Sequence, residues 1–189
     1  MTLMLIGLVM FIGVHSLRII APAWRDARVA AWGITPWKGV YGLLSIVGFA
    51  AMVWGYGLAR QQAVMLWIPP VGLRHAVALF TLPAFILLVA AYVPGNYFKS
   101  RLGHPMVLAV MLWAFAHLLV KGQLPAVLLF GSLLLWSVFS FRAARRREPP
   151  SRAPSSVVRT LVVVVFGALA WAGFAFYLHA RWIGVAPFG

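Results

Sequence analysis

The sequence contains no cysteine and only two carboxylates, Asp26 and Glu148, among its 189 residues. Without cysteine the chain has no disulfide, no thiolate nucleophile, no cysteine-ligated zinc and no iron–sulfur cluster. Both carboxylates lie outside the apolar runs, which disfavours proton pumps, ion-coupled transporters and paired-carboxylate hydrolases, because these use buried acids. Glycine-rich phosphate loops and serine nucleophile elbows are also missing.

Polar residues are scarce in general. Hydrophobic residues make up 63% of the chain and charged residues 10%, against roughly 45 to 50% and about 25% in soluble domains. The mean hydropathy is +0.95, so most side chains must face lipid rather than water. The net charge of +14 comes from Lys and Arg between apolar runs, which is typical of membrane-protein loops and not of nucleic-acid binding.

Six stretches approach the ~20 apolar residues of a spanning helix, which predicts an all-α, polytopic transmembrane bundle. The first stretch lacks a basic start and a cleavage site, so we expect it to remain in the mature protein. The fourth is short, and either begins nearer Leu102 or lies tilted in a thin bundle. The predicted spans are Thr2–Ile20, Gly39–Ala59, Gly72–Val93, Pro105–Val120, Leu124–Phe141 and Val157–His179.

Charge placement predicts the orientation, since Lys and Arg in short loops stay cytoplasmic. Twelve of these residues follow spans one, three and five, and four lie on the other side. Both termini are therefore expected on the periplasmic or exterior face of the membrane. The connection 21–38, with Trp24, Trp32 and Trp37, predicts an interfacial helix at headgroup level, and the basic, proline-rich connection 142–156 predicts a solvated anchor on anionic lipid.

Two packing signals occur inside the spans. Pro83 is expected to kink the third span, and Ala51, Gly55 and Ala59 form a small-xxx-small ridge that allows another helix to approach the second span closely. The aromatic residues of the helices either line a cofactor pocket or pack against lipid, and we favour packing; among them are Tyr92, Trp113 and Phe115.

Histidine is the ionisable residue that the predicted spans retain. His179 stands beside Arg181 and Trp182, so it is interpreted as a residue of the membrane interface. Each remaining histidine can be explained by a hydrogen bond to a neighbouring helix. Together, however, they favour a haem, because neutral imidazole binds iron and haem is an apolar plate. These candidates are His15, His75, His104 and His117.

Arginines stand close to three of these histidines. They are candidates to neutralise haem propionates near the membrane surface, and the alternative is that they are ordinary interfacial cations. The three are Arg18, Arg74 and Arg101.

Depth in the membrane limits the ligand pairs. His104 and His117 are separated by ~20 Å of rise and ~220° of rotation on one helix, so they cannot share an iron. His75 and His117 both lie near the exterior ends of their spans, whereas His15 lies ~7 Å from the cytoplasmic end of its own. On depth alone, His75 with His117 is the preferred pair.

Several segments resemble the NnrU family of bacterial membrane proteins: HSLRIIAPAWR, WKGVYGLLSIVGFAAMVWGYGLAR, VPGNYFKSRLGHPMVLAVMLWAFAHLL and LLFGSLLLWSVFSFRAARRR. The resemblance covers 1–147 and implies a membrane domain of five spans, followed by a cytoplasmic linker at 148–156 and an additional transmembrane helix with a short tail at 157–189. The family is associated with denitrification, and the resemblance implies a bacterial inner-membrane location.

The family is also similar to zeta-carotene isomerases, membrane enzymes thought to hold haem b through histidines. The His-Ser and Ala-His elements of those enzymes resemble His15 with Ser16 and His117 downstream of His104 and Pro105. By this resemblance the ligand pair is His15 with His117. Both pairings contain His117.

The sequence therefore predicts a six-helix membrane protein that binds haem b, with His117 and either His15 or His75 as iron ligands. Its role would be redox or isomerase-type chemistry. The substrate would be a nitrogen oxide or a small lipophilic molecule, and a membrane redox partner is also possible in this hypothesis. The rival hypothesis is a non-enzymatic accessory subunit of a respiratory complex whose histidines bond within or between helices. A third and weaker hypothesis is the uncoupled transport of a small neutral solute.

Overall fold

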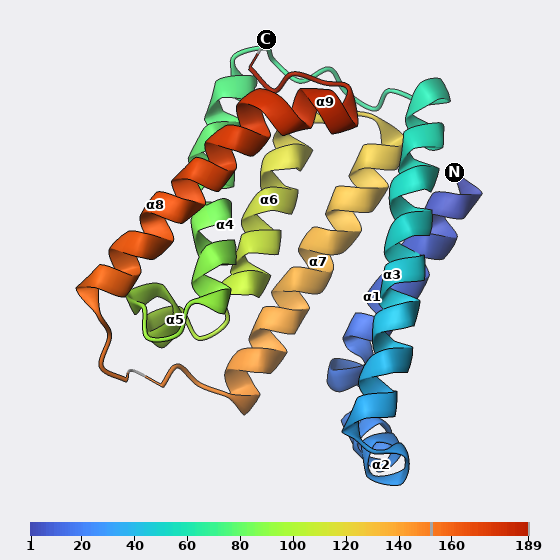
Figure 1. Ribbon diagram of the computed structural model, residues 1–189. Coiled ribbons are helices and arrows are strands. Elements are labelled where there is room, and N and C mark those ends of the chain that lie inside the picture. Colours follow the sequence, from blue (N-terminus) through green and yellow to red (C-terminus); the bar gives the residue numbers. More distant parts are fainter. Residues whose placement is uncertain (152, 189) are drawn as a thin grey trace. The chain divides into compact units, whose positions relative to one another are not determined.

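The computed structural model describes residues 1–151 and 153–188, and this part of the chain is predominantly helical. The chain forms two compact units. The first comprises Met1–Trp67 with Gln123–Ser132, and the second comprises Ile68–Gly122 with Leu133–Gly189. Helix α7 (Leu124–Arg147) begins in the first unit and ends in the second (Figure 1).

In the first unit, α1 packs along α3. Pro22, which lacks the amide hydrogen that a helix interior needs, starts α2 directly after α1, and Gly33, with φ +84°, separates α2 from α3. None of the α2 residues is buried, and the Arg28 guanidinium lies 5.5 Å from the ring centre of Trp24. The helices are α1 (Thr2–Ile20), α2 (Pro22–Trp32), α3 (Ile34–Ala59) and the 3-10 turn η1 (Arg60–Gln62).

Glycines let α1 and α3 approach backbone to backbone. A Cβ atom on Gly55 would overlap the backbone of Met4, and one on Gly48 would lie 3.0 Å from the Phe11 nitrogen. Met4 is fully buried at this crossing. The predicted ridge through Gly55 is thus confirmed as a helix-packing surface, because only small residues permit this separation.

In the second unit, α4 lies between α6 and α8, against both of which it packs (Figure 1). Ala84, Leu87 and Ala109 form the buried core between α4 and α6. On the other side, a Cβ atom on Gly167 would lie 2.6 Å from the Ile86 Cα atom, so α8 also approaches α4 closely. The helices are α4 (Leu73–Tyr92), α5 (Tyr97–Leu102), α6 (Pro105–Val120), α8 (Val157–Gly173), the π-helix η2 (Phe174–Leu178) and α9 (His179–Ile183).

The connection between α7 and α8 packs against the α5 end of this unit. The backbone oxygen of Glu148 accepts a hydrogen bond from His104 Nε2 at 3.0 Å, and the Ser155 hydroxyl lies 2.6 Å from that of Ser100. The backbone amide of Ser156 donates to the Gly95 oxygen at 2.9 Å. The described part of this connection is thus bonded to the helices while most of its residues stay exposed, and its predicted contact with anionic lipid stays a prediction.

The chain is a multi-pass membrane protein. Within the described residues, five helical segments are long and apolar enough to span a bilayer, and α6 is a shorter apolar helix. Large apolar side chains on these segments point outward: Val9 is 72% exposed, Trp54 71% and Phe166 61%. Such surfaces are stable only in contact with lipid or with another apolar partner.

The predicted first and fourth spans match α1 and α6 at both ends, and the predicted third span differs from α4 by one residue at each end. The other spans differ more. Helix α3 begins at Ile34 and α7 continues to Arg147, because amphipathic residues near the membrane surface can extend a helix beyond its apolar part. The suggestion that the fourth span begins nearer Leu102 is wrong, since Gly103, with φ +79°, breaks the chain between α5 and α6. The last span does not end at His179: η2 and α9 carry it on to Ile183.

Candidate functional site

His117 lies one turn before the end of α6, in the second unit. Its Nδ1 atom lies 2.7 Å from the backbone oxygen of Trp113, four residues earlier, and its ring centre lies 4.9 Å from that of Trp113. A carbonyl oxygen can only accept a hydrogen bond, so Nδ1 carries the hydrogen. In the neutral ring the lone pair is then on Nε2, and this is the usual arrangement of a metal-binding histidine.

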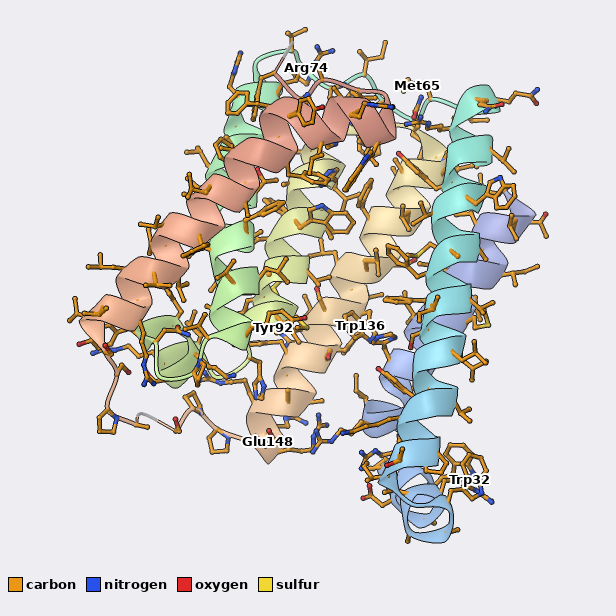
Figure 2. The ribbon with its side chains drawn as sticks, in the orientation of Figure 1. Trp32, Met65, Arg74, Tyr92, Trp136 and Glu148 are labelled. Atoms are coloured by element: carbon orange, nitrogen blue, oxygen red, sulfur yellow. The ribbon has the colours of Figure 1, made fainter. Side chains whose placement is uncertain are left out.

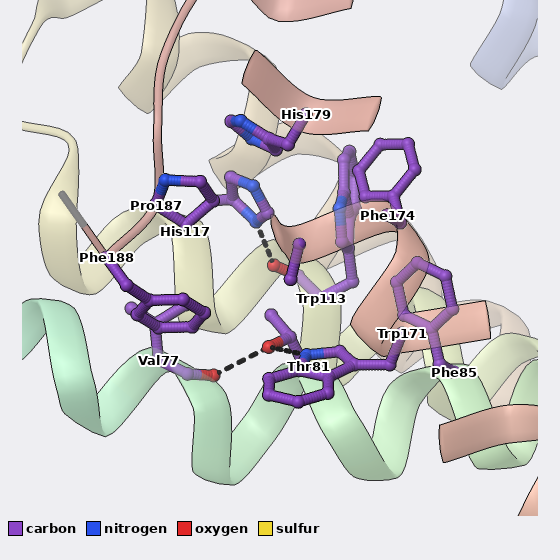
Figure 3. A pocket seen from close by; sticks show the side chains of 11 residues that line it. Val77, Thr81, Phe85, Trp113, His117, Trp171, Phe174, His179, Pro187 and Phe188 are labelled. Atoms are coloured by element: carbon purple, nitrogen blue, oxygen red, sulfur yellow. Dashed lines mark hydrogen bonds between the residues drawn. The ribbon is translucent and has the colours of Figure 1, made fainter. Parts of the chain in front are cut away.

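His179 follows the π-helix at the end of α8. The His179 amide donates to the Phe174 oxygen five residues earlier, in place of the four-residue spacing of an α-helix, and this extra residue turns the following residues onto a different helix face. The His179 ring then faces the same space as His117 (Figure 3). Its Nδ1 atom donates to the Val185 backbone oxygen at 2.6 Å, so this imidazole also has its lone pair on Nε2.

The C-terminal tail returns over this space. Gly184 has φ +75°, a left-handed conformation that reverses the chain and is strained for other residues. Phe188 packs against Trp171 and Phe176, with ring centres 6.1 Å and 5.5 Å apart. The tail residues Val185 to Phe188 therefore cover the end of the unit at which α4 begins and α6 ends.

Two neighbouring cavities adjoin both imidazoles. The first, of about 170 Å³, is lined by cationic Arg74 and Lys121 together with His117, His179 and apolar residues, and no carboxylate is among its described lining residues. Arg74 marks the start of α4 in Figure 2. The second, of about 50 Å³, is lined mainly by apolar and aromatic side chains, including Phe85, Trp113, Trp171, Phe174 and Phe188.

A polar link between α4 and α8 lies beside the smaller cavity. Trp171 Nε1 donates to Thr81 Oγ1 at 3.0 Å, and Thr81 Oγ1 donates to the Val77 oxygen at 3.0 Å (Figure 3). Thr81 is buried. The indole hydrogen is thereby satisfied inside an apolar environment, which fixes the position of the Trp171 ring at the cavity wall.

His75 is in the same unit but is not among the described residues lining the two cavities with His117. It is exposed in the first turns of α4, and its ring lies parallel to that of Phe188, with centres 6.4 Å apart and an interplanar angle of 9°. The pairing of His75 with His117 as iron ligands stays a prediction.

His15 lies in α1 of the first unit and makes the same type of bond as His117. Its Nδ1 atom donates to the Phe11 backbone oxygen, four residues earlier, at 2.8 Å. Its ring centre lies 4.2 Å from that of Phe11 and 5.3 Å from that of Tyr41. His15 therefore also has the tautomer of a metal ligand, and its pairing with His117, which belongs to the other unit, stays a prediction.

The other candidates lie elsewhere. His104 precedes α6 and is bonded through Nε2 to the Glu148 oxygen, at the opposite end of that helix from His117. Arg101 is exposed in the last turn of α5, and Arg18 is exposed in the last turn of α1. Of the three arginines proposed for propionates, Arg74 is the one that lines a cavity together with His117.

Sequence reasoning assigned His179 and Trp113 to ordinary roles. His179 stands beside Arg181 and Trp182, and these neighbours favoured an interfacial role over a role in a site. The π-helix that turns His179 toward His117 has no sequence signature. The signal that was available is the dense aromatic run before it, WAGFAFYLHARW. Trp113 both lines the smaller cavity and accepts the His117 bond, whereas Tyr92 is 71% exposed.

A haem needs fewer protein ligands than a bare metal ion does. Within 1–151 and 153–188, no cluster of three or more His, Asp or Glu residues could hold a bare metal ion. A haem iron takes four of its ligands from the porphyrin, so one or two histidines are sufficient.

Comparison with known protein families gives a match over nearly the whole chain. The family model described as NnrU protein matches residues 3–187. This match includes α8, η2 and α9, which lie beyond the 1–147 region on which the sequence resemblance was based. No curated protein and no solved structure matches the chain.

Proposed function

Since the chain belongs to the NnrU family, we propose that this multi-pass membrane protein binds haem b, with His117 as an axial ligand of the iron. The observation that carries the proposal is the His117 Nδ1 hydrogen bond to the Trp113 oxygen at 2.7 Å. It puts the metal-binding lone pair on Nε2 of a ring that lines the two cavities described above.

The surroundings of His117 also fit the two chemical halves of a haem. The porphyrin plate is apolar, and the smaller cavity has walls of Phe85, Trp113 and Trp171. The propionates are anionic, and the larger cavity carries Arg74 and Lys121. Cations at the polar edge of an apolar site are the partners that such carboxylates require.

A haem needs more space than the two cavities provide. The cavities, of about 170 and 50 Å³, are smaller than the ~300 Å³ at which small-molecule sites begin. Val185, Pro187 and Phe188 contribute to their walls, and these residues belong to the tail that follows Gly184. Haem entry therefore requires the tail to move outward.

Bound haem b would supply a reducible iron for redox or isomerase-type chemistry on a nitrogen-oxide or small lipophilic substrate. The residues of this chain would hold the iron through His117 Nε2, pair the propionates with Arg74 and Lys121, and exclude water with the aromatic walls. Exclusion of water stabilises a neutral imidazole and tunes the potential of a metal site.

A visible absorption spectrum tests the proposal. Purified in mild detergent from haem-replete cells, the protein should show a Soret band with reducible alpha and beta bands. His117→Ala should lose this spectrum, and His104→Ala should retain it, because His104 is bonded to Glu148 at the other end of α6. A colourless wild-type protein contradicts haem binding and leaves the accessory-subunit hypothesis.

A further inference from the structure

The connection between η1 and α4 is apolar, although it joins two membrane spans and would ordinarily be polar. Residues 63–72 read AVMLWIPPVG and contain no charged side chain. The large side chains of this segment point outward: Ile68 is 85% exposed, Val71 71% and Val64 62%. Met65, Leu66 and Trp67 are exposed as well. We call residues 64–71 the apolar loop. An exposed apolar patch of this kind marks a surface that contacts a membrane or a partner.

The backbone of the apolar loop is held at both ends. At its start, the Leu124 amide donates a hydrogen bond to the Val64 oxygen at 2.9 Å, which ties the loop to the first residue of α7. At its end, the Leu73 amide donates to the Pro70 oxygen at 3.1 Å, at the start of α4. The outward position of the apolar side chains is therefore built into the fold.

The position of the loop in the chain favours lipid as its partner. The loop leaves the candidate membrane span that ends at Gln62 and enters the one that begins at Leu73, so its outward surface continues the lipid-facing surface of both spans. It is bounded by Arg60 and Arg74, with no acidic residue between them. Arginines beside an apolar segment can pair with lipid phosphates, and tryptophan, here Trp67, is enriched at the same depth.

The backbone of the loop sets how deep it can lie. In the hydrocarbon core every backbone polar group needs a partner within the protein, so irregular segments are not exposed to lipid there. Pro69 and Pro70 have no amide hydrogen, and the oxygens of Val64 and Pro70 already accept hydrogen bonds. The remaining polar groups need water or headgroups. The loop therefore fits the boundary between headgroups and acyl chains, where interfacial segments bury one apolar face.

We propose that the apolar loop inserts its exposed side chains into this boundary, in the leaflet at its own end of the spans, with phospholipid as its partner. This inference goes beyond the proposed function and needs no haem. Arg74, three residues after Val71, lines the larger cavity, so this cavity lies at headgroup level. A ligand that partitions into the membrane surface then reaches the cavity without passing through bulk water.

Site-directed spin labelling of the full-length chain tests this proposal, since the absence of cysteine allows one nitroxide to be placed at a time. The labelled variants are Met65→Cys, Ile68→Cys and Val71→Cys, in vesicles of phosphatidylethanolamine and phosphatidylglycerol. Power saturation of the electron paramagnetic resonance signal measures collisions with oxygen, which concentrates in lipid, and with a nickel chelate, which stays in water. The ratio of oxygen to nickel collisions should be severalfold higher at these positions than at Gln62→Cys.

Two single-cysteine variants calibrate this ratio. Gln62→Cys replaces an exposed polar residue just before the loop and reports contact with water. Phe166→Cys, on the exposed face of α8, reports contact with lipid. A ratio at Ile68→Cys no higher than at Gln62→Cys shows the loop in water and overturns the proposal. Low collision rates with both reagents show that protein, such as a second copy of the chain, covers the loop, and they overturn it as well.

A charge within the loop provides an independent check that does not depend on the calibration. Ile68→Asp, combined with the label at Met65→Cys, should lower the oxygen-to-nickel ratio at position 65, because a carboxylate is costly in the acyl region and withdraws the loop toward water. An unchanged ratio contradicts insertion of the loop.

Discussion

The indole nitrogen of Trp171 lies 3.0 Å from the hydroxyl oxygen of Thr81 and ties α8 to α4 beside the smaller cavity. The Thr81 hydroxyl in turn donates to the Val77 oxygen. Removing the Thr81 hydroxyl leaves the Trp171 indole hydrogen without this acceptor in a largely apolar region. Removing the Trp171 indole takes one donor from the Thr81 oxygen, whose own hydrogen still bonds to the Val77 oxygen.

Trp171→Phe and Thr81→Val should each destabilise the protein. Interhelical hydrogen bonds in membranes contribute on average about 0.6 kcal/mol and at most about 1.7 kcal/mol, and we expect a coupling energy in this range. The measurement is a double-mutant cycle on unfolding in mixed detergent micelles. Additive effects of the two substitutions, with zero coupling energy, contradict a contribution of this bond to stability.

The crossing of α1 and α3 predicts a large effect from a small substitution. Gly55→Ala places a methyl group against the Met4 backbone, and the helices must separate, at a cost of about 1–3 kcal/mol for overpacking. Gly57→Ala is the matched control on the same helix, because a Cβ atom there meets nothing within 4 Å. Thermal unfolding in detergent should show a lower midpoint for Gly55→Ala alone, and equal midpoints count against the close approach.

Hydropathy predicted the spans because each apolar run must be about as long as the bilayer is thick. It placed the ends of α1 and α6 where the structure has them. It missed α5, because Tyr97–Leu102 is too short and too polar to give an apolar period. Its helical form depends on Asn96, a buried cap whose side chain accepts from the Lys99 amide at 2.9 Å.

The candidate site was predictable in part, for a physical reason. His117 was identified because an imidazole inside an apolar run is costly and therefore conspicuous. His179 was not, because its environment depends on one π-helix hydrogen bond and on the fold-back at Gly184. Neither feature changes the composition or the period of the sequence, so only coordinates reveal that the two rings line the same cavities.

The cationic rim predicts a modest contribution to haem affinity. Arg74 and Lys121 stand at the polar end of the site, where partly exposed ion pairs contribute ~1 kcal/mol or less each. Arg74→Gln and Lys121→Gln should therefore each raise the Kd for haem by at most about fivefold, measured by titration of apoprotein with hemin. The effect should shrink at high salt, because ions screen exposed charge pairs.

Arg101→Gln is the control for this pair of substitutions, since Arg101 is exposed in α5 at the other end of the second unit. Its Kd should equal that of the wild type. A comparable increase in Kd for all three variants would indicate a general loss of positive charge and would remove Arg74 and Lys121 from the propionate site.

The absence of native cysteine makes the predicted orientation directly testable. Gln62→Cys and Ser151→Cys each introduce a single thiol at an exposed position, the first after α3 and the second between α7 and α8. Because the basic loops are expected on the cytoplasmic side, a membrane-impermeant maleimide added to intact spheroplasts should label the Gln62→Cys variant and not the Ser151→Cys variant. Permeabilised cells should label both variants, which controls for thiol reactivity. Labelling of the Ser151→Cys variant alone in intact spheroplasts would show the opposite topology. The larger cavity beside His117 is lined by Arg74 and Lys121, so in that case this end of the second unit would lie on the cytoplasmic side.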